Sequence, residues 1–356
     1  MAVKERLYEI DVLRFFAAIA VAIFHYTFAG NALGSMDQPA FLDLSIFTRY
    51  GYLGVDLFFI ISGFVITMSA ERAASPQHFL TSRFIRLYPA FFVAVLLTAA
   101  ARTFFGGEND DLTISTLFLN LGMLPGVFES WNDIEFVDGV YWSLMAEIKF
   151  YFLILIVLIL RQQKHLQWLM LGWLAATLAS DQIEFTPWLD EFLLLEWSPY
   201  FIAGAMFYQI YAKGLSAIRI ISIAVCLYLS IKYATWRLYE LNELYSEEFS
   251  AQYTSFIVIG LYLIFVLLVS DMLKAFRHPK LLLLGGLTYP LYLIHQEIGY
   301  ILFNQTQYLE QPFVQLAIIS TGIIMASAII HILVEKRFAT RIKERLLRQP
   351  DTFSQA

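Results

Sequence analysis

The sequence has little charge and almost no cysteine, and each shortage excludes a class of protein. Only 15% of the 356 residues are Asp, Glu, Lys or Arg, whereas 59% are hydrophobic, and the mean hydropathy is +0.63. A soluble domain carries a more charged surface, so we predict a polytopic membrane protein. The single cysteine, Cys226, rules out an intramolecular disulfide, and its apolar neighbours in the sequence favour simple packing.

Familiar catalytic motifs are missing as well. The chain contains no HExxH, CxxC, Walker loop, GxGxxG or GxSxG pattern. Metalloprotease, P-loop and α/β-hydrolase chemistry therefore have no support, and we predict no metal site. No cleavable signal peptide is evident, because the N-terminal segment contains Asp11 and Arg14 and lacks a small-residue cleavage site.

What is present is a series of apolar windows of roughly 20 residues, the length that crosses a bilayer as a helix. We predict an all-α polytopic membrane helix bundle of about ten transmembrane helices. The windows are 8–28, 51–70, 87–105, 138–160, 166–180, 197–212, 215–235, 253–272, 281–304 and 313–334. Segment 113–127 is apolar but short and ends in Pro125-Gly126, so it is expected to be re-entrant or interfacial.

The charges orient this topology. Of the 24 Lys and Arg, 18 fall on one side of it, and the loops on the other side are acidic. The positive-inside rule then predicts that both termini are cytoplasmic. We expect a transmembrane domain over 1–335 and a basic cytoplasmic tail over 336–356, whose amphipathic pattern suits anionic lipid headgroups.

The first window carries an arginine and a histidine, Arg14 and His25, eleven residues apart. Three helical turns separate them, so both lie on one face, about 16 Å apart along the axis. A central arginine costs ~3 kcal/mol or more in hydrocarbon. If Arg14 reached the headgroups and His25 lay in the opposite interface, the presence of either residue alone would be explained. That alternative does not explain why both lie on one face, which indicates a functional pair.

Other polar residues interrupt the apolar windows. Gly51, Gly54 and Gly63 are expected to allow close helix packing. Asp56 requires a cation or a donor nearby. Arg83 and Arg86, three residues apart on one helix face, suit either cytoplasmic anchoring or the phosphates of a nucleotide.

Two further residues are harder to interpret. Glu147 falls at about the depth expected for His25, where a carboxylate could orient an imidazole. Its alternative is a structural ion pair with Arg14 or with the neighbours of Lys149. His295, in the ninth window, is either a pathway residue or a helix-contact histidine, and the sequence does not separate these readings.

In these motifs the chain resembles the acyltransferase-3 family of bacterial integral-membrane O-acyltransferases. The matching stretches are Asp11 with the Arg14-x10-His25 pattern, GVDLFFIISGF at 54–64, Arg83-x-x-Arg86 before LYP, WSLMAEIKFY at 142–151 and YPLYLIH at 289–295. Two departures are visible: Ile148 stands where many members have a second acid, and Arg337 replaces the proline of a closing E-x-P.

The resemblance implies an enzyme that moves an acetyl or other short acyl group. The donor would be acetyl-CoA or another acyl-CoA from the cytoplasm, and the acceptor a hydroxyl of a cell-surface polysaccharide or lipid-linked sugar. Arg83 and Arg86 would hold the CoA phosphates, and His25 would act as general base or, less readily, accept the acyl group.

In the same scheme Arg14 would stabilise oxyanion charge or position the thioester, and Glu147 or Asp56 would orient His25. The expected partners are the donor, the glycan and membrane lipid, without nucleic acid, and the expected location is the bacterial inner membrane. A secondary transporter and a passive glycan flippase are the rival functions, although the chain lacks the paired broken helices of many transporters.

Overall fold

The computed structural model describes residues 7–37, 41–107, 112–125, 135–183, 185–309, 311–339 and 341. All regular elements of these residues are helices. The long ones are α1 (Tyr8–Phe24), α4 (Gly54–Arg72), α5 (Pro76–Phe105), α7 (Tyr141–Ile159), α8 (Leu166–Ser180), α10 (Ser198–Lys213), α11 (Ala217–Trp236), α13 (Ala251–Val269), α14 (Leu282–Ile294), α15 (Gln296–Gln305) and α16 (Pro312–Ile330). The short ones are α2 (Gly30–Ala32), α3 (Leu42–Thr48), α6 (Ile114–Leu121), α9 (Pro187–Phe192) and α12 (Leu238–Tyr245).

This architecture confirms the predicted all-α membrane bundle. Every predicted window contains a helix, and seven helical segments of the described residues are long and apolar enough to cross a membrane. The other three windows correspond to α8, to α10 and to α14 with α15, which are shorter helices. The count of ten spans and the cytoplasmic placement of both termini stay predictions.

Three boundaries differ from expectation. Helix α5 begins eleven residues before the predicted window, because Ser75 caps its N-terminus and Pro76 occupies the first turn. Arg83 and Arg86 therefore lie inside a long helix rather than before it. The ninth window is split at His295 into α14 and α15. A π-helical turn, His25–Ala29, follows α1.

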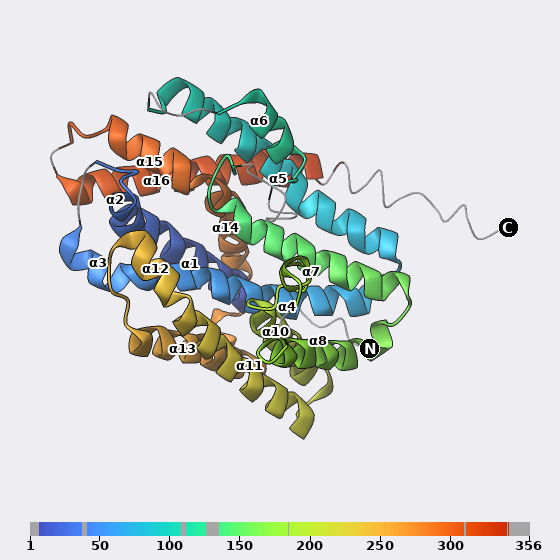
Figure 1. Cartoon of the computed structure of the whole chain (residues 1–356). Helices are drawn as coiled ribbons and strands as arrows, with labels where there is room; N and C mark the ends of the chain where they lie inside the picture. Colours follow the sequence, from blue (N-terminus) through green and yellow to red (C-terminus); the bar gives the residue numbers. More distant parts are fainter. Residues whose placement is uncertain are drawn as a thin grey trace.

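Helix α6 agrees with the prediction for segment 113–127. It has only eight residues, about 12 Å of helix, which is too short to span a bilayer. It lies beside one end of α5 (Figure 1). Much of the acidic loops at 108–111 and 129–138, and most of the tail 336–356, lie outside the described residues.

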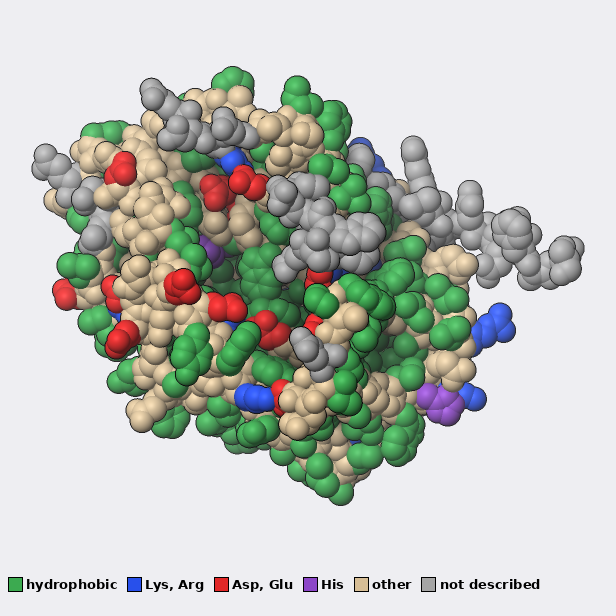
Figure 2. Space-filling view, viewed as in Figure 1, with side chains coloured by type: hydrophobic (Ala, Val, Ile, Leu, Met, Phe, Trp, Pro, Cys, Tyr) green, Lys and Arg blue, Asp and Glu red, His purple; other side chains and the backbone are tan. Residues whose placement is uncertain are grey.

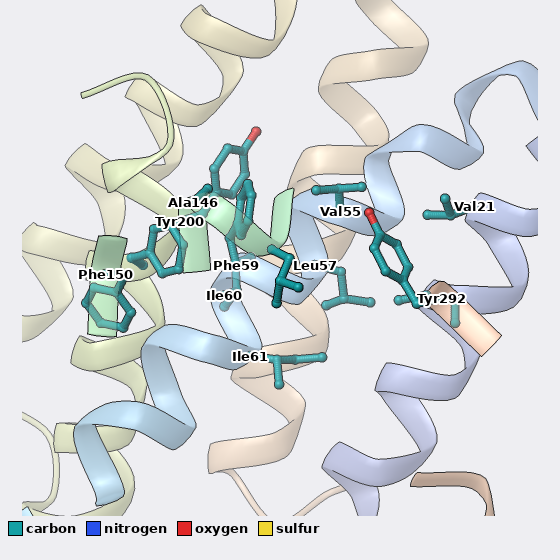
Figure 3. Close-up of a cluster of buried hydrophobic side chains, with 14 of the residues drawn as sticks. Val21, Val55, Leu57, Phe59, Ile60, Ile61, Ala146, Phe150, Tyr200 and Tyr292 are labelled. Carbon is teal, nitrogen blue, oxygen red and sulfur yellow. The ribbon is translucent and has the colours of Figure 1, made fainter. Parts of the chain in front are cut away.

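Helix α4 is the hub of the bundle. It packs most extensively on α10, and side chains of α1, α7, α10 and α14 surround it (Figures 1 and 3). A Cβ at Gly63 would lie 2.1 Å from the Phe201 carbonyl oxygen, and one at Gly54 would lie 2.7 Å from that of Ala17. Only glycine permits this closeness, so the predicted packing role of these glycines is confirmed.

Candidate active site

His25 stands where α1 gives way to the π-helical turn. Such turns leave the regular hydrogen-bond ladder and are frequent at functional sites. The Nδ1 atom of His25 lies 2.9 Å from the carbonyl oxygen of Val21, one turn earlier, and the ring is partly exposed. The helix end therefore both positions the imidazole and leaves part of it accessible.

The partner of His25 is His295, which the sequence singled out without linking it to His25. His295 is fully buried at the junction of α14 and α15, and its Nε2 atom lies 3.1 Å from Nδ1 of His25. Its own Nδ1 lies 2.8 Å from the Tyr292 carbonyl oxygen. We call His25 and His295 the histidine pair. A separation of 270 residues explains why the sequence offered no signal for this contact.

The acceptors around the pair fix where the protons must sit. A carbonyl oxygen only accepts, so the Nδ1 of His295 carries a proton for Tyr292, and its Nε2 is left as an acceptor. The Nδ1 of His25 then faces two acceptors, the Val21 oxygen and the Nε2 of His295, and must be the donor. In this arrangement the Nε2 of His25 keeps a free lone pair, as a general base requires.

The structure corrects the role predicted for Glu147. Its Oε1 atom accepts hydrogen bonds from the hydroxyls of Ser62 and Tyr151, each at 2.5 Å, and no contact with His25 is formed. Glu147 also forms no ion pair with Arg14 among the described residues. The helix geometry explains the error, because depth along a span does not fix the direction in which a side chain points.

Asp56 was also predicted to orient His25, and this is wrong for the same reason. It is fully buried and forms an ion pair with Arg237, which joins α11 to α12, at 3.5 Å. Arg237 in turn lies 3.0 Å from Glu196 and stacks over the Trp197 ring at 3.9 Å. The expectation that Asp56 needs a cation is confirmed, but the cation comes from a predicted outer loop.

Arg14 lies three turns from His25 and faces a narrow cavity of about 70 Å³. Ser62, Arg86, Glu147 and Tyr292 line the same cavity. No hydrogen bond or ion pair joins Arg14 or Arg86 to another side chain in the described part of the chain. Two guanidinium groups against the single carboxylate of Glu147 give this cavity a net positive lining, which suits an anionic or carbonyl-rich ligand.

A second, wider cavity of about 640 Å³ adjoins the narrow one, because Arg86 and Tyr289 line both. We call it the basic cavity. Its charged lining residues are Arg83, Arg86, Lys280, Lys336, Asp11 and Glu335, together with His331, which bonds to Glu335. Four cations against two carboxylates give a net positive lining that favours a polyanion. Arg83 and Arg86, predicted to share a face, do share this cavity.

A third cavity, of about 700 Å³, lies beside the first half of α7, which lines it with Trp142, Met145 and Lys149. We call it the tryptophan cavity, after Trp142, Trp197 and Trp236 in its wall. Ion pairs between Lys149 and Glu191 at 2.7 Å and between Lys232 and Asp181 at 2.5 Å cross its rim. Figure 2 shows carboxylates around a hollow floored by hydrophobic side chains. Its aromatic and acidic lining differs in character from the basic cavity.

Comparison with known proteins places the chain among acyltransferases by sequence similarity. The acyltransferase domain family matches residues 7–333. Nodulation protein 10 of Rhizobium leguminosarum bv. viciae is 30% identical over 40% of this chain and 41% of its own length. Acyltransferase MdmB of Streptomyces mycarofaciens is 31% identical over 41% and 38%. Peptidoglycan O-acetyltransferase OatA of Listeria monocytogenes is 24% identical over 40% and 22%.

These alignments span about two fifths or less of each relative, so they do not by themselves transfer a whole activity. No solved structure matches the chain. The family match nevertheless covers nearly the whole sequence and contains the histidine pair together with Arg14, Arg83 and Arg86. The chain therefore belongs to the acyltransferase-3 family, as its motifs indicated.

Proposed function

We propose that this enzyme transfers an acetyl or other short acyl group from cytoplasmic acyl-CoA to a hydroxyl of a cell-surface polysaccharide or a lipid-linked sugar. The observation that carries the proposal is the histidine pair, whose hydrogen bonds leave Nε2 of His25 as a base. Arg14 and His25 sit on one helix, so a donor that enters beside Arg14 is directed towards the base.

The basic cavity supports an acyl-CoA donor. CoA carries several phosphates, and the arginines and lysines of this cavity offer the forked and point charges that bind them. The narrow cavity continues from Arg86 past Arg14 to Tyr292, three residues from His295. We infer that the pantetheine arm follows this passage, with Arg14 as a contact along it. Membrane anchoring remains the rival role for Arg83 and Arg86.

The reaction then proceeds by general base catalysis. As the acceptor hydroxyl attacks the thioester carbonyl, its proton moves to Nε2 of His25, a C–O bond forms and the C–S bond breaks. The resulting imidazolium donates more strongly from Nδ1 to His295, which stabilises the transition state. The proton leaves with the CoA thiolate. Direct acylation of His25 is a second route that uses the same atom.

The acceptor is proposed to be a glycan on two grounds. One relative is named a peptidoglycan O-acetyltransferase and another an exopolysaccharide production protein. The tryptophan cavity adds aromatic faces beside hydrogen-bonding charges, a combination that suits the apolar and hydroxyl-rich surfaces of a sugar. We propose residence in the bacterial inner membrane, with this cavity on the outer side and the basic cavity on the cytoplasmic side.

Sidedness is testable with impermeant thiol reagents. In a Cys226→Ala background, cysteines introduced at Ser75 and Gln163 should resist labelling in intact cells. A cysteine at Asn242 should label, because the ten-span topology puts α12 outside. Labelling at position 163 from outside would contradict the topology and the sides assigned to donor and acceptor.

The function itself is tested by supplying membranes with acetyl-labelled acetyl-CoA. We expect free CoA to be released and the label to appear in surface glycan, both in proportion to the amount of this protein. A transporter or flippase would leave the thioester intact. Intact acetyl-CoA in membranes that contain folded protein would refute the proposal.

A further inference from the structure

The hydroxyl of Tyr300 is buried and has no hydrogen-bond partner in the described part of the chain. The residue is only 4% exposed. Burying an unpaired polar group costs about 1–3 kcal/mol, so such groups are rare in native proteins and call for an explanation. Phenylalanine would fill the same space without this cost. Enzymes often keep a side chain that lowers stability when that side chain is needed for activity.

Tyr300 lies against the base. Its ring and that of His25 meet edge to face, with centroids 6.1 Å apart. A Cβ at Gly30 would lie 2.8 Å from Cε1 of Tyr300, the carbon next to the one that bears the hydroxyl. The hydroxyl end of the ring therefore lies beside Gly30, directly after the π-helical turn, and the same Cβ position is 3.0 Å from the carbonyl oxygen of His25.

Two other tyrosines near the histidine pair have hydroxyls that are hydrogen-bonded within the protein. Tyr26 donates to the His295 carbonyl oxygen at 2.8 Å, and the hydroxyl of Tyr292 lies 2.7 Å from that of Ser143. These bonds hold the helices around the pair in place. The Tyr300 hydroxyl, near the same histidine pair, has no hydrogen-bond partner in the described part of the chain and can therefore donate to a ligand.

Acyl transfer places negative charge on the thioester carbonyl oxygen, and the site needs a donor for it. The sequence suggested Arg14 for this role, but Arg14 lies about 16 Å from His25 along α1. We propose that Tyr300 is a catalytic residue that donates a hydrogen bond from its hydroxyl to this oxygen. The inference rests on the proposed function and deepens it by naming the oxyanion donor.

The test compares two tyrosine-to-phenylalanine variants of the full-length protein in membranes. Tyr300→Phe keeps the ring and removes only the hydroxyl, so we expect turnover of acetyl-CoA to fall about 10²–10³-fold, the effect of losing one oxyanion donor. The half-saturating acetyl-CoA concentration and the thermal stability in detergent should not fall. Tyr52→Phe is the matched control: its hydroxyl is also buried without a partner in the described part of the chain, but its ring packs against Phe24, with centroids 5.8 Å apart. It should turn over normally.

Normal turnover by Tyr300→Phe beside an active parent would overturn the role of this tyrosine. An equal loss in both variants, or a Tyr300→Phe protein that does not fold, would assign the effect to packing and also overturn it. A parent that does not cleave acetyl-CoA would instead refute the proposed function, so the two failures are distinguishable.

Discussion

Replacing His295 tests whether it supports His25 or merely fills space. With alanine at position 295, the Nδ1–H of His25 loses one acceptor but keeps the Val21 oxygen at 2.9 Å. A hydrogen bond from a charged group is worth about 1.5–3 kcal/mol, and each 1.4 kcal/mol of barrier is about tenfold in rate. Loss of the bond therefore predicts a fall of about 10- to 150-fold. The remaining acceptor favours the lower end of this range.

Two conservative variants make the test selective. A glutamine at position 295 can place its carbonyl oxygen where Nε2 now accepts from His25, whereas an asparagine reaches only the position of Nδ1. We expect His295→Gln to recover turnover and His295→Asn to resemble His295→Ala. The assay is CoA release in membranes at saturating acetyl-CoA, normalised to folded protein. Rescue by asparagine instead, or full activity of the alanine variant, would refute the proton arrangement.

Three further predictions concern the donor site, the buried ion pair and the helix packing. Arg86→Lys keeps the charge but loses the guanidinium fork, so the half-saturating acetyl-CoA concentration should rise while membrane insertion stays normal. An unchanged half-saturating concentration would mean that Arg86 only anchors the helix at the membrane surface. Arg237→Ala leaves Asp56 buried without a cation and should cost about 3–5 kcal/mol of stability. Adding Asp56→Asn should recover much of the thermal stability, and no recovery would contradict the pairing. Gly204→Ala would place a Cβ 2.0 Å from the α4 backbone and should cost at least about 1–3 kcal/mol of stability. Gly172→Ala, whose Cβ would meet nothing within 4 Å, is the control and should be tolerated. Equal melting temperatures of the two variants would argue against the close crossing of α4 and α10.

The sequence predicted the features that depend on local composition. Apolar length identified the helices, and the short segment around α6 was correctly set apart. The glycines of α4 indicated close packing, and the buried charge of Asp56 required a cation. These predictions succeeded because each depends on the polarity or size of residues within a single helix, which the sequence gives directly.

Features that depend on which helices meet could not be predicted. The sequence does not show that α14 breaks at His295 and delivers that ring to His25. Nor does it show that Glu147 turns towards Ser62 and Tyr151, because residues at the same depth can face different neighbours. Pairing a carboxylate with His25 was reasonable chemistry, but the bundle supplies an imidazole in its place.

The most direct measurement of the central claim is acyl transfer by His25→Ala protein that is folded and inserted. Acetyl-CoA should still bind, since the basic cavity is unchanged, but transfer to surface glycan should fall ~10²–10⁴-fold, the usual loss with a general base. Because the pair acts as a unit, adding His295→Ala should reduce transfer little further. Normal acylation of the glycan by well-expressed His25→Ala protein would contradict the account.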